Sequence, residues 1–394
     1  MVSVGCGELD APVQDDIAWM QAHTTHYLEN TAWRRAELEA SLWRAELPYA
    51  RKRLAGYALA DGGWDLLPEL QSLSGLVFSE GASAQLGPLV EFSTTVPTTR
   101  QGWLELGEAV FWRMPMRRDN YLEWLVERPE LVDAVGIARN DDGSLRGVVS
   151  FKDARGEQRV GATCGMCHGQ DGVAGLASSS LDLGLGRALY NETHGRPGDV
   201  YAAWGAGRVD VTDDTEADPL AIPNLWGAKY QSYLNASAAV RVASPASLAV
   251  RFETQYIVGH GLEARPNRVL VWALAMYVLS LEPPAPTSSP AAQAAVGAAI
   301  FDAACATCHY PNAGYSGDLI DAGLLVGQSP AAYSPLRGTG MLKVPSLIGV
   351  GAGGPYFHDG RHATLQSLLQ DNHPFGAPLS GADQDALEAF LNTL

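Results

Sequence analysis

The sequence predicts a mainly α-helical fold in which an extra helical region precedes two similar halves. Three observations predict it: long stretches with helical periodicity, two copies of one six-residue cysteine motif, and short segments that recur in the same order around both copies. With 394 residues, 46% of them hydrophobic, the chain has room for two or three domains and a substantial core.

The first predicted element is helical. Residues 15–60 are rich in Ala, Leu, Glu and Arg, carry three tryptophans at nearly helical intervals, and begin at Asp15 or Asp16, either of which can cap a helix. This pattern predicts two helices interrupted near Pro48. Residues 61–100 hold many Gly, Ser, Thr and Pro residues and are typical of loops.

Later elements follow from local patterns in the same way. Residues 143–162 alternate apolar and polar side chains around a polar ARGEQ, which predicts a small β-hairpin leading into the first motif. Residues 265–281 read as an apolar, buried helix that stops before the linker PPAPTSSP, residues 283–290. A second helix follows at once, and the last fifteen residues form a closing helix capped by Ser380 and Asp383.

The two halves repeat each other. VGAAIF at 296–301 matches LGEAVF at 106–111, and KVPSL at 343–347 matches AIPNL at 221–225. Residues 373–394 align without a gap on residues 260–281. The first copy carries an insertion at about 112–160, because its cysteine motif comes much later after the matched phenylalanine. We therefore predict a region at 1–99, a first domain at 100–284 and a second at 285–394.

The motifs themselves are CGMCHG, Cys164 to Gly169, and CATCHY, Cys305 to Tyr310. In C-x-x-C-H, one helical turn lets two cysteines form thioethers with haem vinyl groups while the histidine reaches the iron, so the pattern is read as c-type haem attachment. A thioredoxin-like pair does not need the histidine twice, and a zinc site would want both cysteine pairs on one metal. The sequence thus predicts two tandem cytochrome c-like domains with two covalently bound haem c groups. Their attachment residues are Cys164, Cys167, His168, Cys305, Cys308 and His309.

The residue at each sixth iron position decides between electron transfer and oxygen or peroxide chemistry. His168 and His309 are the expected proximal ligands, and the repeat nominates His260 and His373 as their distal partners. A surface histidine in a polar turn is the alternative for both. Further candidates for axial or propionate contacts are Met341, His358 and His194.

Charge and export signals limit the partners. The formal charge of −17 argues against nucleic acid and leaves room for a basic redox protein. No apolar run is long enough to span a bilayer. Covalent haem attachment implies an extracytoplasmic, periplasmic location, and Ser-Val-Gly-Cys, ending at Cys6, resembles a lipoprotein lipobox; the alternative is a stray thiol. The acidic run at 209–219 could bind calcium or be a solvated loop.

The stretch KVPSLIGVGAGGPYFHDGRHATLQSLL, residues 343–369, resembles the bacterial di-haem cytochrome c peroxidases and the related enzymes that oxidise protein tryptophans or cleave rubber. The resemblance covers about 290 residues, from near 100 to the end of the sequence. It implies a reactive first haem and a second haem that relays electrons. Where peroxidases carry the second haem's methionine, this chain has Asn372 followed by His373, as in the rubber-oxygenase branch.

At the first haem, the resemblance places Arg251 near a distal glutamine position and His260 near a distal glutamate position. An Arg and His pair could act in general acid-base catalysis on peroxide or dioxygen, or His260 could bind the iron and close the site. The usual bridging tryptophan is missing, and Tyr233 or Trp226 are its substitutes. We expect a di-haem oxidoreductase. The alternatives are an electron carrier with both irons six-coordinate, and a structural subunit that docks through its N-terminal helices.

Overall fold

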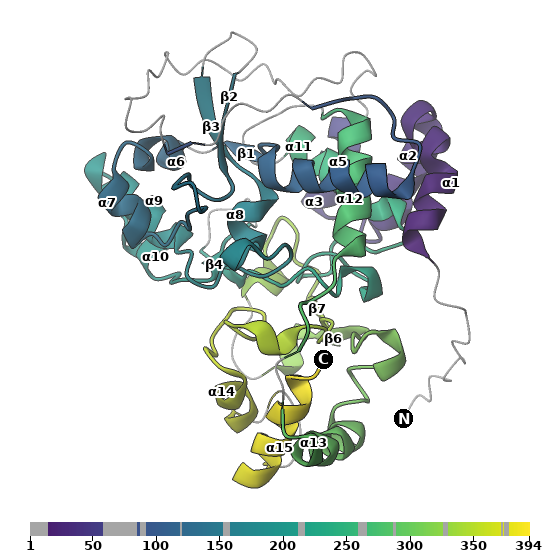
Figure 1. Ribbon diagram of the computed structural model, residues 1–394, viewed down its shortest axis with the longest axis vertical. Coiled ribbons are helices and arrows are strands. Elements are labelled where there is room, and N and C mark those ends of the chain that lie inside the picture. Colours follow the sequence, from purple (N-terminus) through teal and green to yellow (C-terminus); the bar gives the residue numbers. More distant parts are fainter. Residues whose placement is uncertain are drawn as a thin grey trace.

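The computed structural model describes residues 15–57, 85–86, 92–118, 120–152, 158–211, 217–258, 266–286, 289–325, 330–371, 373 and 378–394. Within these ranges the protein is mainly helical, as predicted, with short antiparallel strand pairs. In Figure 1 the elements from α13 onward (green to yellow) form a smaller lower part, and the earlier elements form the larger upper part.

The helices are α1 (Asp16–Glu29), α2 (Thr31–Ser41), α3 (Pro48–Tyr57), α5 (Arg100–Arg113), α6 (Asn120–Leu125), α7 (Pro129–Ala134), α8 (Cys164–His168), α9 (Leu183–Thr193), α10 (Asp199–Ala202), α11 (Ala246–Val258), α12 (Arg268–Ser280), α13 (Ala291–Ala304), α14 (Leu365–Gln370) and α15 (Gly381–Leu391). The strands are β1 (Arg117–Arg118), β2 (Val148–Lys152), β3 (Gln158–Ala162), β4 (Arg208–Val209), β5 (Leu220–Ala221), β6 (Leu319–Asp321) and β7 (Met341–Lys343).

The N-terminal region differs from the prediction of two helices. Asn30 ends α1 in an extended conformation and its side chain accepts a hydrogen bond from the Trp33 amide, so one residue stops one helix and starts the next. Pro48 begins α3 rather than interrupting a helix, because proline is tolerated in the first turn. The predicted loop at 61–100 lies largely outside the described residues.

These N-terminal helices pack onto the first half of the repeat. Tyr27 of α1 stacks on Trp272 of α12 with 4.1 Å between ring centroids, and the Trp272 indole donates to the Thr24 hydroxyl at 3.2 Å. The Tyr49 amide also donates to the Leu336 carbonyl of the second half at 2.9 Å. The N-terminal region therefore touches both halves of the chain.

The predicted hairpin is confirmed as β2 and β3, which pair antiparallel with Val148 opposite Ala162. The short strand β1 adds to the far side of β3. This sheet and helices α6, α7 and α9 share a second hydrophobic core. The bidentate pair between Arg159 of β3 and Glu123 of α6 is fully buried in it, at 2.7 and 2.8 Å.

Helix α5 packs against α12, and α13 packs against α15. A Cβ added to Gly107 of α5 would lie 2.2 Å from the Ala273 carbonyl oxygen, and one on Gly297 of α13 would lie 1.9 Å from the Ala386 carbonyl oxygen. Gly107 and Gly297 are matched positions in the repeat, and so are Ala273 and Ala386. Only a residue without a Cβ allows such close backbone contact.

Aromatic packing repeats at the same crossings. Phe111 lies 5.6 Å from Tyr277, and Phe301 lies 5.3 Å from Phe390, measured between ring centroids. Tyr277 and Phe390 are again matched residues. The repeat alignment therefore describes equivalent three-dimensional contacts, while the domain boundaries at 99 and 284 stay a prediction.

Candidate functional site

The first cysteine motif forms the one-turn helix α8. Trp112, the last but one residue of α5, packs against it: a Cβ on Gly165 or Gly169 would come within 2.3 or 2.4 Å of the Trp112 ring. Burial raises the pKa of Tyr256 of α11 and the nearby Cys164 thiol adds to the shift, so α11 also lies beside the motif. Cys164 and Cys167 are both partly buried. The first motif is thus enclosed by α5 and α11.

The His168 ring is held by a backbone carbonyl. Its Nδ1 lies 3.0 Å from the Pro223 carbonyl oxygen. A carbonyl can only accept, so Nδ1 carries the proton and the Nε2 lone pair is available to a metal. Burial lowers the pKa of His168 to about 4, which the Pro223 carbonyl only partly offsets, so the ring is neutral at pH 7.

The second motif begins where α13 ends. Cys305 caps that helix, and the His309 amide donates to the Cys305 carbonyl at 2.9 Å, so one further helical bond carries the chain through the motif. The residues from 305 to 308 form turns, so this copy is not a regular helix as predicted. A Cβ on Gly317 would lie 1.8 Å from the Cys308 carbonyl oxygen, which makes a glycine necessary there.

The His309 ring is oriented like that of His168. Its Nδ1 lies 2.9 Å from the Tyr315 carbonyl oxygen, and the Pro345 carbonyl is a second acceptor. Burial lowers the pKa of His309 and leaves it neutral, with Nε2 again available. Pro223 and Pro345 are the matched prolines of AIPNL and KVPSL. Sequence reasoning found these segments but not their role, which is to supply the carbonyl facing each histidine.

Exposure separates the two motifs. Cys308 is exposed, and so are the neighbouring Asp302 and Thr307, whereas every residue from Cys164 to Gly169 is at least partly buried. The second motif therefore reaches the protein surface, and the first is more deeply buried.

His373 lies near the second motif, while its predicted role as a ligand stays a prediction. Solvent reaches its ring, yet the surrounding protein is dense enough that desolvation lowers its pKa to about 4, with further lowering by His309, His362 and His358. Phe357 presents its ring to His373 at 5.2 Å and 90°. His373 thus shares one neighbourhood with His309, although the two lie 64 positions apart in the sequence.

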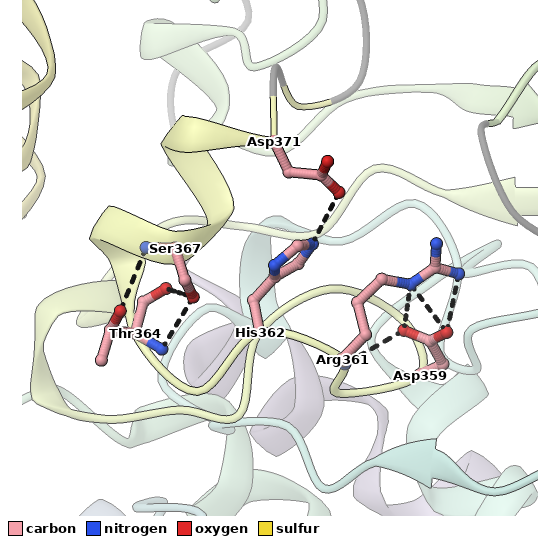
Figure 2. A network of polar contacts seen from close by, with 6 residues as sticks. All are labelled: Asp359, Arg361, His362, Thr364, Ser367 and Asp371. Atoms are coloured by element: carbon pink, nitrogen blue, oxygen red, sulfur yellow. Dashed lines mark hydrogen bonds and ion pairs between the residues drawn. The ribbon is translucent and has the colours of Figure 1, made fainter. Parts of the chain in front are cut away.

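Figure 2 shows the polar contacts around this neighbourhood. His362 Nε2 lies 3.5 Å from an Asp371 carboxylate oxygen at the end of α14, and Arg361 pairs with Asp359 at 2.7 Å. Arg361 also lies over the Phe357 ring at 4.7 Å. These contacts fix the loop that carries Phe357 and brings His358 and His362 close to His373.

Arg251 lies on α11, where it donates to Gln255 at 2.7 Å and lies near enough to Tyr49 to lower the pKa of that phenol. The guanidinium groups of Arg53 and Arg337 approach the same phenol. Arg251 therefore shares a helix with Tyr256, which lies beside the first motif. Its predicted partner His260 lies outside the described residues.

The remaining candidates have other neighbours. His194 is exposed at the end of α9, and its Nδ1 lies 2.6 Å from the Tyr190 carbonyl. The His358 carbonyl accepts from the Ala221 amide at 3.0 Å, and desolvation lowers the pKa of its ring to about 4. Met341 is half-buried in β7. None of these contacts links the three residues to an iron position, and their roles stay predictions.

Trp226 occupies the junction between the two halves. Its side chain is buried, and its indole donates to the Ala174 carbonyl at 2.9 Å. A Cβ added to Gly349 of the second half would lie 2.2 Å from its ring. Tyr233 instead packs edge-on against Trp43 at 5.8 Å. Of the two substitutes for the bridging tryptophan, Trp226 is the one that contacts the segments beside both motifs.

In the described part of the chain, no group of three or more His, Cys, Asp or Glu side chains is placed to hold a metal ion directly. Residues 212–216 of the predicted calcium loop lie outside that part. The described helices also include none long and apolar enough to cross a membrane.

Comparisons with known proteins add little to this geometry. No protein-family model matches the sequence, and no curated protein matches it either. Among solved structures, the chain is similar to hydrazine synthase from Kuenenia stuttgartiensis, with 14% sequence identity, coverage of 86% of this chain and 98% of that chain, and a TM-score of 0.42. A likeness at that score carries no argument about fold or activity, so the function must be argued from the site itself.

Proposed function

We propose that the protein is a c-type cytochrome with two haems, one attached at Cys164 and Cys167 with His168 as proximal ligand, and one at Cys305 and Cys308 with His309. The observation that carries the proposal is the matched orientation of the two histidines. Each is neutral and has Nδ1 held by a carbonyl, the arrangement that orients an imidazole ligand and increases its basicity toward iron. A thiol redox pair would not require an oriented histidine behind each motif, and a zinc site would want both cysteine pairs on one metal.

Variants of the attachment cysteines test the proposal. In protein matured with a haem-attachment system, we expect Cys164→Ser/Cys167→Ser and Cys305→Ser/Cys308→Ser each to lose half of the covalently bound haem, measured by the haem absorbance that stays with the protein after extraction of free haem. Cys6→Ser is the control and should keep all of it. Full haem content in either motif variant would contradict the proposal.

We further propose an oxidoreductase in which the two haems have different roles. Haem iron supplies one-electron chemistry and, where its sixth position is open, binds peroxide or dioxygen. The enclosure of the first motif by Trp112 and Tyr256 supports a protected reaction site there. The exposed Cys308 supports electron exchange with an external redox protein at the second.

In this proposal, different side chains serve the two haems. His373 would be the second histidine to hold the second haem, which its placement near His309 supports. Arg251 and His260 would serve the first haem: Arg251 would supply a positive charge there, and His260 would hold or move a proton or would itself bind the iron. We propose that electrons pass between the haems by way of Trp226, which its contacts with segments of both halves support.

The alternative function is an electron carrier in which both irons are six-coordinate. Electron paramagnetic resonance of the oxidised protein separates the two. A high-spin ferric signal that grows in His260→Ala supports an open first haem closed by His260. Two low-spin signals, unchanged in that variant, would remove His260 from the first iron and favour a different ligand such as His194.

Location follows from the same chemistry. We propose an extracytoplasmic, periplasmic protein, because covalent haem attachment occurs there, with a lipid on Cys6 as its anchor. Metabolic labelling with a radioactive fatty acid tests the anchor: label should appear in a full-length precursor and be absent from Cys6→Ser. The acidic run at 209–219 either binds calcium or is a solvated loop, and calcium content after dialysis separates the two.

A further inference from the structure

Two strained aromatic residues lie beside the histidines of the second motif. Of the residues other than glycine that have a positive φ in the described part of the chain, the two with bulky side chains are Tyr315 (φ 55°) and Phe357 (φ 73°). A bulky residue in this conformation is strained, and such strain persists only where the surrounding structure holds it, most often at functional sites. The Tyr315 carbonyl accepts from His309, and the Phe357 ring contacts His373. Each strained residue therefore touches one histidine of the candidate site.

Phe357 has polar neighbours although its side chain is apolar. The preceding residue, Tyr356, packs against the apolar core of the second half. In the described part of the chain, the rings that Phe357 contacts are instead those of His358 at 4.5 Å, His373 at 5.2 Å and His362 at 6.1 Å, measured between centroids. A contribution to the apolar core is thus not what keeps Phe357 in its strained conformation.

Contacts within the loop hold this ring in place. Tyr356 and His362 form a β-bridge across the loop, in which the Tyr356 amide donates to the His362 carbonyl at 2.7 Å. Arg361 lies over the Phe357 ring at 4.7 Å and is itself held by Asp359 at 2.7 Å (Figure 2). The guanidinium therefore covers one side of the ring, while the bridge closes the backbone around it.

The first half of the chain holds the same loop from outside. The Ala221 amide donates to the His358 carbonyl at 3.0 Å, and the Arg208 guanidinium donates to the Gly360 carbonyl at 2.9 Å. The backbone next to Phe357 is thus fixed by hydrogen bonds at both ends of the turn. This is the condition under which a strained residue persists in a folded protein.

The ring of His373 needs such a neighbour because it is exposed. An exposed imidazole can adopt several rotamers, and only some of them suit a metal that His309 also binds. Phe357 meets the ring edge to face, at 90° between the ring planes, which is an arrangement that aromatic pairs prefer. The contact restricts His373 in advance, and restriction of this kind reduces the entropy lost on binding.

We propose that Phe357 is a positioning residue that keeps the ring of His373 directed toward the second haem, as the Tyr315 carbonyl does for His309. The inference rests on the proposed ligation of the second haem by His309 and His373. Phe357 itself does not bind the iron and acts only through His373. The strained loop is therefore part of the ligand site.

Competition with cyanide tests the proposal in the mature protein with both haems attached. His373→Ala first identifies, by electron paramagnetic resonance, the low-spin signal that depends on His373, and the cyanide concentration that removes half of this signal is then measured. Phe357→Gly removes the ring and suits a positive φ, and Phe357→Asn does the same with a side chain that tolerates it. Both should lower that concentration roughly two- to tenfold, the effect of releasing one ordered side chain. Phe357→Tyr keeps the ring and should match the wild type.

The controls separate this role from general stability and from the ligation itself. Leu391→Ala removes apolar volume from the core at α15 and should leave the cyanide concentration unchanged. An equal effect in Leu391→Ala and Phe357→Gly would overturn the positioning role. So would a wild-type cyanide concentration in both ring-less variants, although ligation by His373 would then still stand. If His373→Ala has the spectrum of the wild type, ligation by His373 fails and the inference fails with it.

Discussion

The close crossing of α13 and α15 predicts that Gly297→Ala destabilises the second half of the chain. A Cβ at this position would lie 1.9 Å from the Ala386 carbonyl oxygen and 2.8 Å from Phe390 Cβ, whereas real Cβ contacts stay above 3.0 Å. The helices would have to separate by about 1 Å along the first contact. Overpacking of this kind costs typically about 1–3 kcal/mol. The higher helix propensity of alanine offsets at most about 1 kcal/mol of this cost.

The expected net loss is therefore on the order of 1 kcal/mol, and up to about 2 kcal/mol, in the free energy of unfolding. Urea denaturation followed by circular dichroism measures it, and Gly107→Ala at the matched crossing of α5 and α12 should behave alike. Gly381→Ala is the control, because nothing lies within 4 Å of a Cβ at the first residue of α15. If Gly297→Ala were as stable as Gly381→Ala, the close crossing would be refuted.

Three further predictions follow from the contacts of single side chains. Glu123→Ala leaves the buried Arg159 guanidinium without its carboxylate, so the free energy of unfolding measured in urea should fall by about 3–5 kcal/mol. Glu123→Leu/Arg159→Met removes both charges and should lose much less. Equal losses in the two variants would contradict this. Desolvation lowers the pKa of Lys343 to about 8, so the folded protein binds fewer protons than the unfolded chain between that pH and the ordinary lysine value near 10.5. The free energy of unfolding should therefore rise as pH increases through this window. At pH 7 the charged, buried Lys343 destabilises the fold, so Lys343→Met should be more stable than the wild type. This difference should shrink toward pH 10, and a constant difference would rule the prediction out. His373→Met should raise the reduction potential of the second haem in a potentiometric titration, since thioether ligation favours the reduced iron, and an unchanged potential would exclude His373 as a ligand.

Much of the fold could be predicted because its signals are local. The apolar run before the linker forms α12, Ser380 caps α15 by accepting from the Asp383 amide, and the alternating stretch forms β2 and β3. The repeat gave more, since it matched Gly297 with Gly107 and Ala386 with Ala273, and the structure shows the same close contact within each half. Repetition of sequence here reflects repetition of contacts.

The features of the fold and the site that could not be predicted depend mainly on contacts between segments far apart in the sequence. The carbonyl of Pro223 reaches His168 across 55 positions, and no local pattern states that pairing. The Asn30 break was missed because an asparagine inside a helical pattern gives only a weak stop signal, although it can cap the next helix. The enclosure of the first motif by Trp112 likewise depends on how α5 packs against α8.

Intact-protein mass spectrometry of the matured, full-length chain tests the central claim most directly. The account predicts a mass increase equal to two covalently attached haems, with tryptic peptides that place one on the Cys164 peptide and one on the Cys305 peptide. A matured protein that carries one haem or none would contradict it and would require another explanation for the two carbonyl-held histidines.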